Sequence, residues 1–371
     1  MKKYFKKYII ESISLLIILI FSLLNMYKAP LLSSKYNYYF QKELLWILCG
    51  LLLFILIQKI SFKKIFKIRY ILYLLNIILL LYVLIFSKET NGIKAWIKIG
   101  SFSFQPSELV KITVPLCIIK LINDKKYSIS FILFLIPSIL ILLEPDTGNF
   151  ILLFFIYIYL LLNKNNKKIF LFLFIIFLLI AITSIYIFKF YPSIISNIFN
   201  GSLYYRFKRL LSINKNYQIN NALIGIGSSS LKPISINKII IYIPEGITDF
   251  IFSFNICNYG IMLSLVLILF YILFVNSLLK KYKKRMYYFK KKLLGSFLTI
   301  FTIQTFYNIF MNIGLLPIMG IPLPFLSYGG SNIITYFIMY SLATKKISSI
   351  EDKDNNSYKN NFRKVLADKH S

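Results

Sequence analysis

The sequence is dominated by long apolar runs that are separated by short polar stretches. A helix needs about 20 mostly apolar residues to cross the hydrocarbon core of a bilayer. Two of the runs are short and meet at Glu144-Pro145-Asp146, where a tight helical hairpin is expected. The pattern predicts an all-α, polytopic integral membrane protein with about ten transmembrane helices, over residues 8–26, 44–60, 68–87, 108–122, 130–143, 148–163, 169–189, 250–279, 292–313 and 329–344.

Basic residues cluster between these runs and predict the orientation. Cytoplasmic loops of membrane proteins carry an excess of Lys and Arg. If the N-terminus is cytoplasmic, the basic stretches 2–7, 59–69, 120–126, 164–168 and 280–292 all lie inside. We therefore expect a single transmembrane domain over residues 1–350 with both termini cytoplasmic. It would carry one long external loop over about 190–249 and end in a polar cytoplasmic tail, residues 351–371.

The formal net charge of +31 does not indicate a nucleic-acid partner. A nucleic-acid binder gathers Lys and Arg on one face of a folded domain. Here they lie between apolar segments, where they set topology and meet anionic headgroups, so membrane lipids are the expected partners. Cys49, Cys117 and Cys257 lie in apolar runs and predict neither a disulfide nor a zinc cluster. The single histidine, His370, is near the C-terminus, which argues against a histidine-based site.

Ionisable residues at membrane depth are costly and are functional candidates by default. Glu108 and Lys111 are three residues apart, so they share a helix face and can pair. Pro106 should open this helix, and Ser107 and Glu108 suit its first turn. The pair either supports the site directly or is a structural ion pair that orients the helix.

Two carboxylates, Glu144 and Asp146, flank Pro145 at a predicted external turn. They are candidate ligands for a divalent cation, Mg²⁺ or Mn²⁺, or for a substrate hydroxyl. The alternative is a solvated turn.

The predicted external loop contains a basic segment, with Arg206, Lys208 and Arg209. Guanidinium and ammonium groups near the outer leaflet suit recognition of a substrate diphosphate. A Gly-Ser stretch at 225–228 could add backbone amides for an anion. Attraction to lipid headgroups would also account for the basic residues.

Asp249 lies where the external loop re-enters the membrane. Partial desolvation there would make its carboxylate a better general base. However, Asp before an apolar helix is also a common N-cap. The sequence does not separate a catalytic base from a helix cap.

Gln304, Asn308 and Asn312 are spaced at i, i+4 and i+8 and form one polar stripe on an apolar helix. Such a stripe faces protein or a water-filled cavity. The following residues, 314–331, contain too many Pro and Gly for a regular helix, and broken backbone at membrane depth is tolerated where it lines a cavity or packs in protein. We expect the stripe to line a cavity with Ser327 and Tyr328; a stiff inter-helix loop is the alternative.

These motifs, taken together and in order, resemble the SEDS family (shape, elongation, division and sporulation). The resemblance covers about residues 8–345. It rests on Gln105-Pro106-Ser107-Glu108 with Lys111, Pro145-Asp146-Thr147-Gly148, Thr248-Asp249-Phe250 and Pro324-Phe325-Leu326-Ser327-Tyr328-Gly329-Gly330-Ser331. The stretch 320–324 is more similar to the RodA branch than to the FtsW branch.

The resemblance implies a peptidoglycan glycosyltransferase that polymerises lipid II at the outer face of the bacterial cytoplasmic membrane. A class B penicillin-binding protein would be its partner. Asp249 matches the family's proposed catalytic carboxylate, and Glu108 and Lys111 match its ion pair. Two alternatives remain, a transporter of lipid-linked precursors and a non-catalytic scaffold for the penicillin-binding protein.

Overall fold

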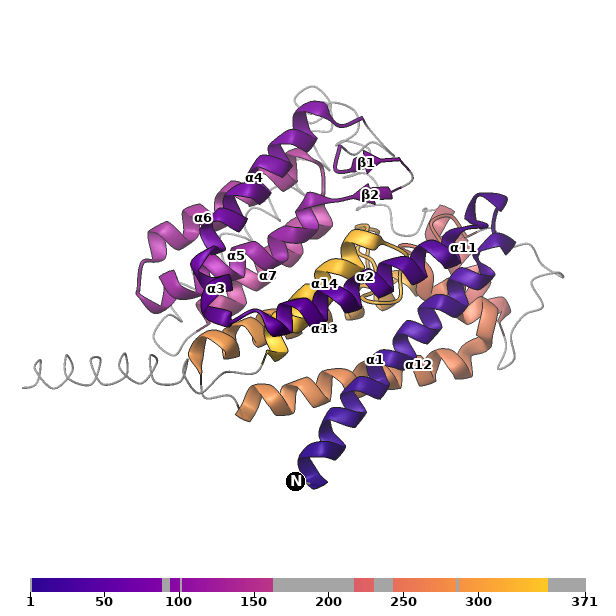
Figure 1. Cartoon of the computed structure of the whole chain (residues 1–371). Coiled ribbons are helices and arrows are strands. Elements are labelled where there is room, and N and C mark those ends of the chain that lie inside the picture. Colours follow the sequence, from indigo (N-terminus) through magenta and orange to yellow (C-terminus); the bar gives the residue numbers. More distant parts are fainter. Residues whose placement is uncertain are drawn as a thin grey trace, which may run out of the picture.

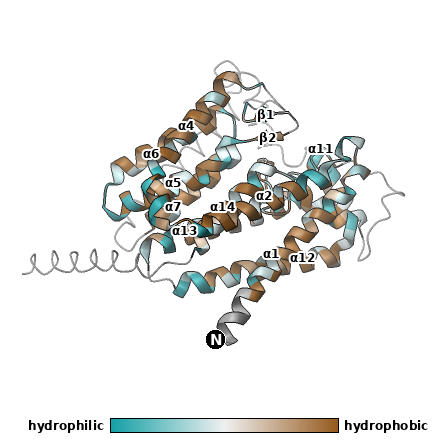
Figure 2. Ribbon diagram, viewed as in Figure 1, coloured by the Kyte–Doolittle hydropathy of each residue, from teal (hydrophilic) through white to brown (hydrophobic). Residues whose placement is uncertain are grey.

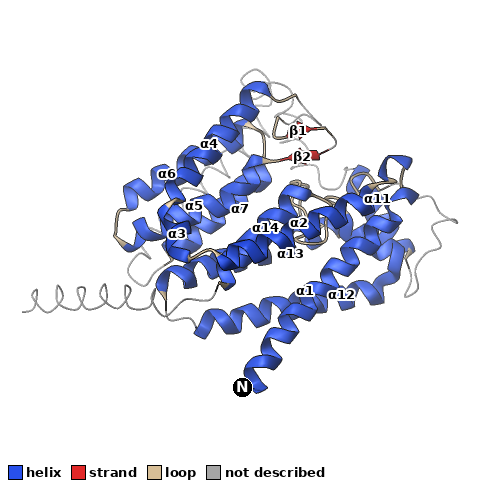
Figure 3. Cartoon of the chain, in the orientation of Figure 1, coloured by secondary structure: helices blue, strands red, loops and turns tan. Residues whose placement is uncertain are grey.

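The computed structural model describes residues 2–88, 94–100, 102–162, 217–229, 243–284 and 287–345. Within them the chain is a bundle of helices (Figures 1 and 3). The long ones are α1 (Lys2–Lys28), α2 (Tyr39–Lys59), α4 (Arg69–Phe86), α5 (Pro106–Asn123), α6 (Tyr127–Leu143), α7 (Thr147–Leu161), α12 (Ile251–Lys284), α13 (Tyr288–Asn312) and α14 (Gly330–Thr344).

The predicted multi-pass architecture is confirmed. Each predicted span coincides with one of these helices except 169–189, which lies outside the described residues, as does the tail 351–371. In the part of the chain that the structure describes, five helices, α1, α2, α4, α12 and α13, are long and apolar enough to cross a membrane. As expected, α6 and α7 are shorter, with 17 and 15 residues.

Several small elements were not predicted. They are the 3-10 turns η1 (Ala29–Leu31) and η2 (Ser34–Tyr36), helices α3 (Phe62–Lys67) and α11 (Tyr217–Ser228), and an antiparallel pair of strands, β1 (Ile97–Ile99) and β2 (Phe102–Phe104). These elements are small additions to the predicted all-α fold, which the structure confirms. Each strand has only three residues, too few for an alternating pattern to be recognised.

Helix α5 is the centre of the bundle, because it contacts α4, α6 and α7 as well as α13 and α14. Pro106 occupies its first turn, as predicted. Almost every later residue is buried, including Val114, Cys117 and Ile118 at 0% exposure. A helix that is apolar all round is expected inside a protein, so α5 is held by neighbours on every side.

Helix α12 packs on α1 and α2 packs on α14 (Figure 1). Within α12 the backbone breaks at Gly260, which has φ +80°, a value that glycine adopts without strain. Asn255 bridges this break and α1, because its Nδ2 donates to Ser264 Oγ and its Oδ1 accepts from Asn25 Nδ2, both at 2.9 Å. The kink is thus fixed by side chains on both helices.

The outward faces of the helices are largely apolar (Figure 2). Exposed residues of this kind include Leu16, Leu52, Ile71, Ile132 and Leu265. Contiguous apolar surface of this extent marks contact with lipid in a chain whose helices can span a bilayer.

Some of the basic residues have a structural role at helix ends. Lys292 Nζ donates to the carbonyl oxygens of Leu160 and Leu162, both at 3.1 Å, at the C-terminal end of α7. Lys345 Nζ donates to those of Ile57 and Gln58 at the end of α2. An ammonium group suits these positions, because the last carbonyls of a helix lack partners and carry partial negative charge.

A prediction concerns the close approach of α14 to α2. A Cβ atom added to Gly330 would lie 2.1 Å from Trp46 Cε2, so Gly330→Ala forces the two helices apart. We expect it to destabilise the protein by roughly 1–3 kcal/mol, as overpacking does. Thermal unfolding in detergent would measure this. Gly227→Ala in α11 is the matched control, since no atom lies within 4 Å of its added Cβ; equal melting temperatures for the two variants would contradict the prediction.

Candidate active site

Asp249 lies at the end of a turn, just before α12. The helix begins at Ile251, and Phe254 N donates to Phe250 O at 3.0 Å, so Phe250 occupies the cap position. The Asp249 side chain is partly exposed, and its Oδ2 lies 3.7 Å from where a Cβ on Gly320 would be. The helix-cap alternative is therefore not what the structure shows.

The backbone of Asp249 is fixed by the end of α13. Its carbonyl oxygen accepts hydrogen bonds from Asn308 Nδ2 at 2.8 Å and from Asn312 Nδ2 at 3.1 Å. Asn312 Oδ1 in turn accepts from the backbone N and the hydroxyl of Ser253 in α12. Two amide side chains thus join the start of α12 to the end of α13.

The same stripe also holds the broken segment 313–329. Asn308 Nδ2 donates to Ile321 O, and Gln304 Nε2 donates to Pro322 O, both at 2.8 Å. Side-chain donors here satisfy carbonyl groups that no helix could satisfy, which is the condition for irregular backbone at membrane depth.

The broken segment is in turn bonded to the residues before Asp249. Ser327 Oγ donates to Thr248 O at 2.6 Å and accepts from Leu323 N at 2.7 Å. Tyr328 N donates to Ile247 O at 2.9 Å. The backbone of residues 247–249 is therefore held by the broken segment and by the amide side chains of α13.

The cavity-lining role predicted for the stripe is corrected by these contacts. Gln304, Asn308, Asn312 and Ser327 are all at 0% exposure, so they pack inside protein and do not face an open cavity. Tyr328 differs, because it is partly exposed and its ring lies 4.3 Å, centroid to centroid, from Tyr39 of α2.

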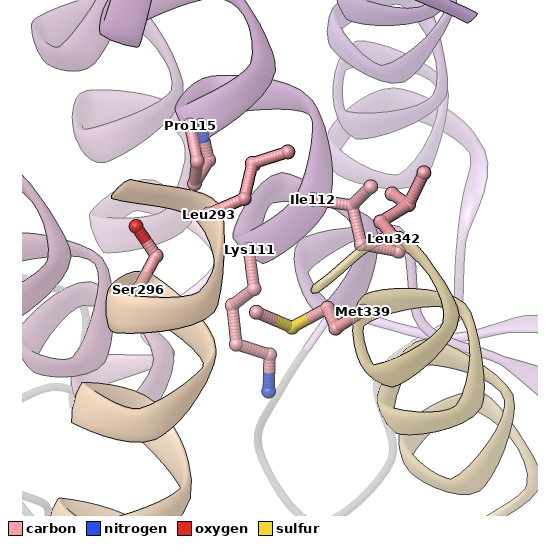
Figure 4. Close-up of a pocket in the computed structure, with 7 residues that line it drawn as sticks. All are labelled: Lys111, Ile112, Pro115, Leu293, Ser296, Met339 and Leu342. Carbon is pink, nitrogen blue, oxygen red and sulfur yellow. The ribbon is translucent and has the colours of Figure 1, made fainter. Parts of the chain in front are cut away.

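The predicted pairing of Glu108 with Lys111 is confirmed. Lys111 Nζ lies 2.8 Å from Glu108 Oε2, and the two residues are 1% and 3% exposed. Asn332 Nδ2 of α14 donates to the same oxygen at 3.2 Å. Figure 4 shows the Lys111 side chain extending between Leu293 and Ser296 of α13 and Met339 of α14. A buried ion pair of this kind is kept by close partners on three helices.

A line of contacts connects this ion pair with the Asp249 region. Lys111 Nζ is 5.7 Å from the ring centroid of Tyr336, whose hydroxyl donates to Gln304 Oε1. Gln304 then holds Pro322 of the broken segment. The arrangement favours the structural alternative for the pair, as a support that orients α5 against α13 and α14.

Asp146 is the N-cap of α7 and is surrounded by donors. Its Oδ1 accepts from Asn149 N at 3.0 Å, and its Oδ2 accepts from Gln105 Nε2, Ser107 Oγ and Asn149 Nδ2. Four hydrogen bonds to a residue that is 8% exposed indicate a carboxylate that is already satisfied by protein.

Glu144, in the turn between α6 and α7, is at 0% exposure, and neither carboxylate oxygen has a hydrogen-bond partner. Burial, together with the charge of Asp146, raises the pKa of Glu144 to about 9, so this side chain is neutral at pH 7. Within the described residues no cluster of His, Cys, Asp and Glu could hold a metal ion. This pair does not fit a Mg²⁺ or Mn²⁺ site, and the solvated-turn alternative also fails.

The basic residues Arg206, Lys208 and Arg209 lie outside the described residues. The Gly-Ser stretch 225–228 belongs to α11, so its backbone amides serve that helix and are not presented to an anion. Ile219 and Ala222 of α11 are buried in contact with α12 and α13. The predicted external loop thus includes a helix packed on the site.

Sequence reasoning missed Glu43 of α2, which is at 0% exposure. Ser22 Oγ of α1 donates to its Oε1 at 2.7 Å, and the backbone amide of Gly329 interacts with the carboxylate. Glu43 therefore joins α1 and α2 to the end of the broken segment. The predicted span began at residue 44, which left this buried carboxylate one position outside the membrane.

Comparison with known proteins defines the family. A sequence profile of the FtsW, RodA and SpoVE proteins, described as cell cycle proteins, matches residues 5–350. The chain is 31% identical over 357 residues, 89% of both chains, to a probable peptidoglycan glycosyltransferase FtsW of Wigglesworthia glossinidia brevipalpis. It is 28% identical over 279 residues, 71% of this chain and 73% of the other, to the peptidoglycan glycosyltransferase MrdB of Escherichia coli. The chain belongs to the FtsW/RodA/SpoVE family.

Solved structures show the same fold. A chain from a study of how a peptidoglycan synthase complex coordinates polymerisation and crosslinking superimposes with a TM-score of 0.72. The rod shape determining protein RodA of Thermus thermophilus gives 0.64. Both are 22% identical and match 90% of this chain, which covers 95% and 94% of theirs.

A prediction tests the amide stripe. Asn308→Ala leaves the buried carbonyl of Ile321 without its donor, which costs roughly 1–3 kcal/mol, and leaves the carbonyl of Asp249 with Asn312 as its remaining donor. We expect a lower melting temperature and a loss of any activity that depends on Asp249. Asn258→Ala is the control, because the Asn258 Nδ2 bonds only to Phe254 O one turn earlier in its own helix. Similar losses for both variants would contradict a positioning role for Asn308.

A second prediction concerns Glu144. The pKa of Glu144 is raised from 4.5 to about 9 on folding, so the folded protein keeps this side chain protonated at pH values where the unfolded chain loses the proton. The contribution of the protonated side chain to the free energy of unfolding is therefore full below pH 4.5 and is lost as the pH rises towards 9. Glu144→Gln should therefore become progressively more stable than the wild type between these values. Melting temperatures at pH 5, 7 and 9 would measure this, with Glu245→Gln as the control. Stabilisation of the wild type by Mg²⁺ that Glu144→Gln abolishes would instead restore a metal site.

Proposed function

We propose that this chain is a peptidoglycan glycosyltransferase that polymerises lipid II, with Asp249 as the general base. Membership of the FtsW/RodA/SpoVE family supports the reaction class, since its relatives are described as peptidoglycan glycosyltransferases. The position of Asp249, partly exposed at the end of a re-entering loop, supports the residue assignment.

In the proposed reaction the acceptor sugar hydroxyl is activated by Asp249. The hydroxyl oxygen attacks the anomeric carbon of the donor, the new glycosidic bond forms, and undecaprenyl diphosphate leaves while Asp249 takes the proton. General-base assistance of this kind contributes roughly 10²–10⁴-fold to the rate. The reaction needs a carboxylate that is accessible to substrate yet fixed in place.

The observation that carries the assignment is the way the backbone around Asp249 is held. Its carbonyl oxygen accepts two buried amide donors, while Ile247 and Thr248 are bonded to the broken segment. None of these bonds uses the Asp249 carboxylate, which lies against Gly320. Rigid support by neighbouring side chains is what a preorganised catalytic group requires.

The leaving diphosphate would be stabilised by Arg206, Lys208 and Arg209, whose positive charges are opposite to its negative charge. A divalent cation, Mg²⁺ or Mn²⁺, could supply the same stabilisation at the diphosphate, although not through Glu144 and Asp146.

The partner and the orientation are part of the proposal. A related fold occurs in a peptidoglycan synthase complex that couples polymerisation and crosslinking, which supports a class B penicillin-binding protein as partner. We place Asp249 at the outer face and both termini in the cytoplasm, because the basic loops then lie inside. The stretch 320–324 favours a role in elongation and cell shape, as in RodA; the relatives include both FtsW and MrdB.

The kink at Gly260 keeps one alternative open, a transporter of lipid-linked precursors, since interrupted helices occur in such proteins. A liposome assay that measures flipping of lipid II without polymerisation would distinguish the two functions. If the chain is instead a non-catalytic scaffold for the penicillin-binding protein, cells that carry an Asp249 variant should keep their normal shape.

The prediction is that Asp249→Asn abolishes glycan-strand synthesis from lipid II by the purified protein. The substitution removes the base but preserves the hydrogen bonds to the main chain. The free energy of unfolding should therefore stay within about 1 kcal/mol of the wild-type value. The assay is run with and without the cognate penicillin-binding protein. Asp124→Asn, an exposed carboxylate outside the site, is the control. Normal polymerisation by Asp249→Asn would refute the base assignment.

A further inference from the structure

A cluster of cations and aromatic rings lies at the end of the bundle opposite to Asp249. Helix α3 follows the C-terminal end of α2 and precedes α4 (Figure 1). Its Phe62 and Phe66 pack against Phe289 of α13, with centroid distances of 5.5 and 4.8 Å. Lys64 and Lys67 of the same helix are exposed. The short helix therefore has one aromatic face fixed to the bundle and one basic face outside.

Two cations share the ring of Phe66. The Arg69 guanidinium carbon is 3.8 Å and Lys120 Nζ is 6.0 Å from its centroid. Neither Arg69 nor Lys120 forms an ion pair within the described residues. The ring of Phe66 therefore gathers two positively charged side chains at one place on the bundle.

The positive charge of Arg69 is buried and has little compensation from neighbouring groups. Arg69 is 8% exposed, its Nη1 donates to Phe66 O at 2.7 Å, and its Nε is buried without a hydrogen-bond partner. Contacts with the rings of Phe66 and Tyr70 offset part of its charge. A buried cation is normally paired with an anion, because desolvation without a partner is costly.

We infer that this cluster, Arg69 with Lys64, Lys67 and Lys120, binds the phosphate of an anionic phospholipid headgroup. A guanidinium fork suits phosphate oxygens, and basic pockets between transmembrane helices bind acidic headgroups. Ile68 and Ile71, next to Arg69 in the sequence, have exposed apolar side chains that offer a surface to the acyl chains of such a lipid. The site is independent of the proposed transferase reaction.

The test is lipid binding by the full-length chain in detergent, followed by native mass spectrometry. Phosphatidylglycerol should bind about tenfold or more tightly than phosphatidylcholine, and inorganic phosphate should not compete. Lys64→Gln with Lys120→Gln should weaken phosphatidylglycerol binding about tenfold, since each removes one charge near the headgroup. Lys35→Gln with Lys98→Gln, which removes two lysines distant from α3 in the sequence, should not.

Arg69→Lys keeps the charge but loses the fork, and it should weaken phosphatidylglycerol binding several-fold. If this variant does not fold, the variant with both Lys64→Gln and Lys120→Gln still tests whether the cluster binds phosphatidylglycerol. Equal phosphatidylglycerol binding by the double-lysine variant and its control would overturn the site. Equal binding of phosphatidylcholine by the wild type, or full competition by inorganic phosphate, would overturn the lipid assignment.

Discussion

The structure depends on how carbonyl groups at membrane depth find donors where the chain is not helical. Between α13 and α14 the backbone is irregular, and no water in the bilayer core could satisfy it. Gln304 and Asn308 supply the missing donors to Pro322 and Ile321, and Asn308 also reaches Asp249. One buried stripe on one helix therefore determines both the broken segment and the position of the carboxylate beside it.

This constraint explains why so many polar side chains are buried in an apolar bundle. Each joins two different helices: Glu43 bridges α1 and α2, Asn332 bridges α14 and α5, and Asn255 bridges α12 and α1. The apolar surface of a helix gains little free energy when it exchanges contact with lipid tails for contact with another helix. Hydrogen bonds and close packing must therefore specify how the helices are arranged. Mutual support of this kind makes a site rigid without a soluble domain around it.

The sequence predicted the spans that fall within the described residues, since a run of apolar residues is a strong and local signal. It also predicted the pairing of Glu108 with Lys111, because helix periodicity fixes which residues share a face. It could not assign the stripe at Gln304, because a polar face indicates either a cavity or protein, and the choice depends on Pro322, 18 residues later. Glu43 was missed for a related reason, since its partner Ser22 lies on another helix.

Glu144 and Asp146 show that sequence spacing alone does not define a metal site. Both are carboxylates at one turn, yet Asp146 is saturated by donors from α5 and α7, whereas Glu144 is buried without any. A divalent cation needs charged oxygens that point into a common space. Asp249 differs from both, because its carbonyl group is held by Asn308 and Asn312 while its side chain remains partly exposed. That combination, a fixed backbone and a partly exposed residue, is the physical basis for proposing Asp249 as the base.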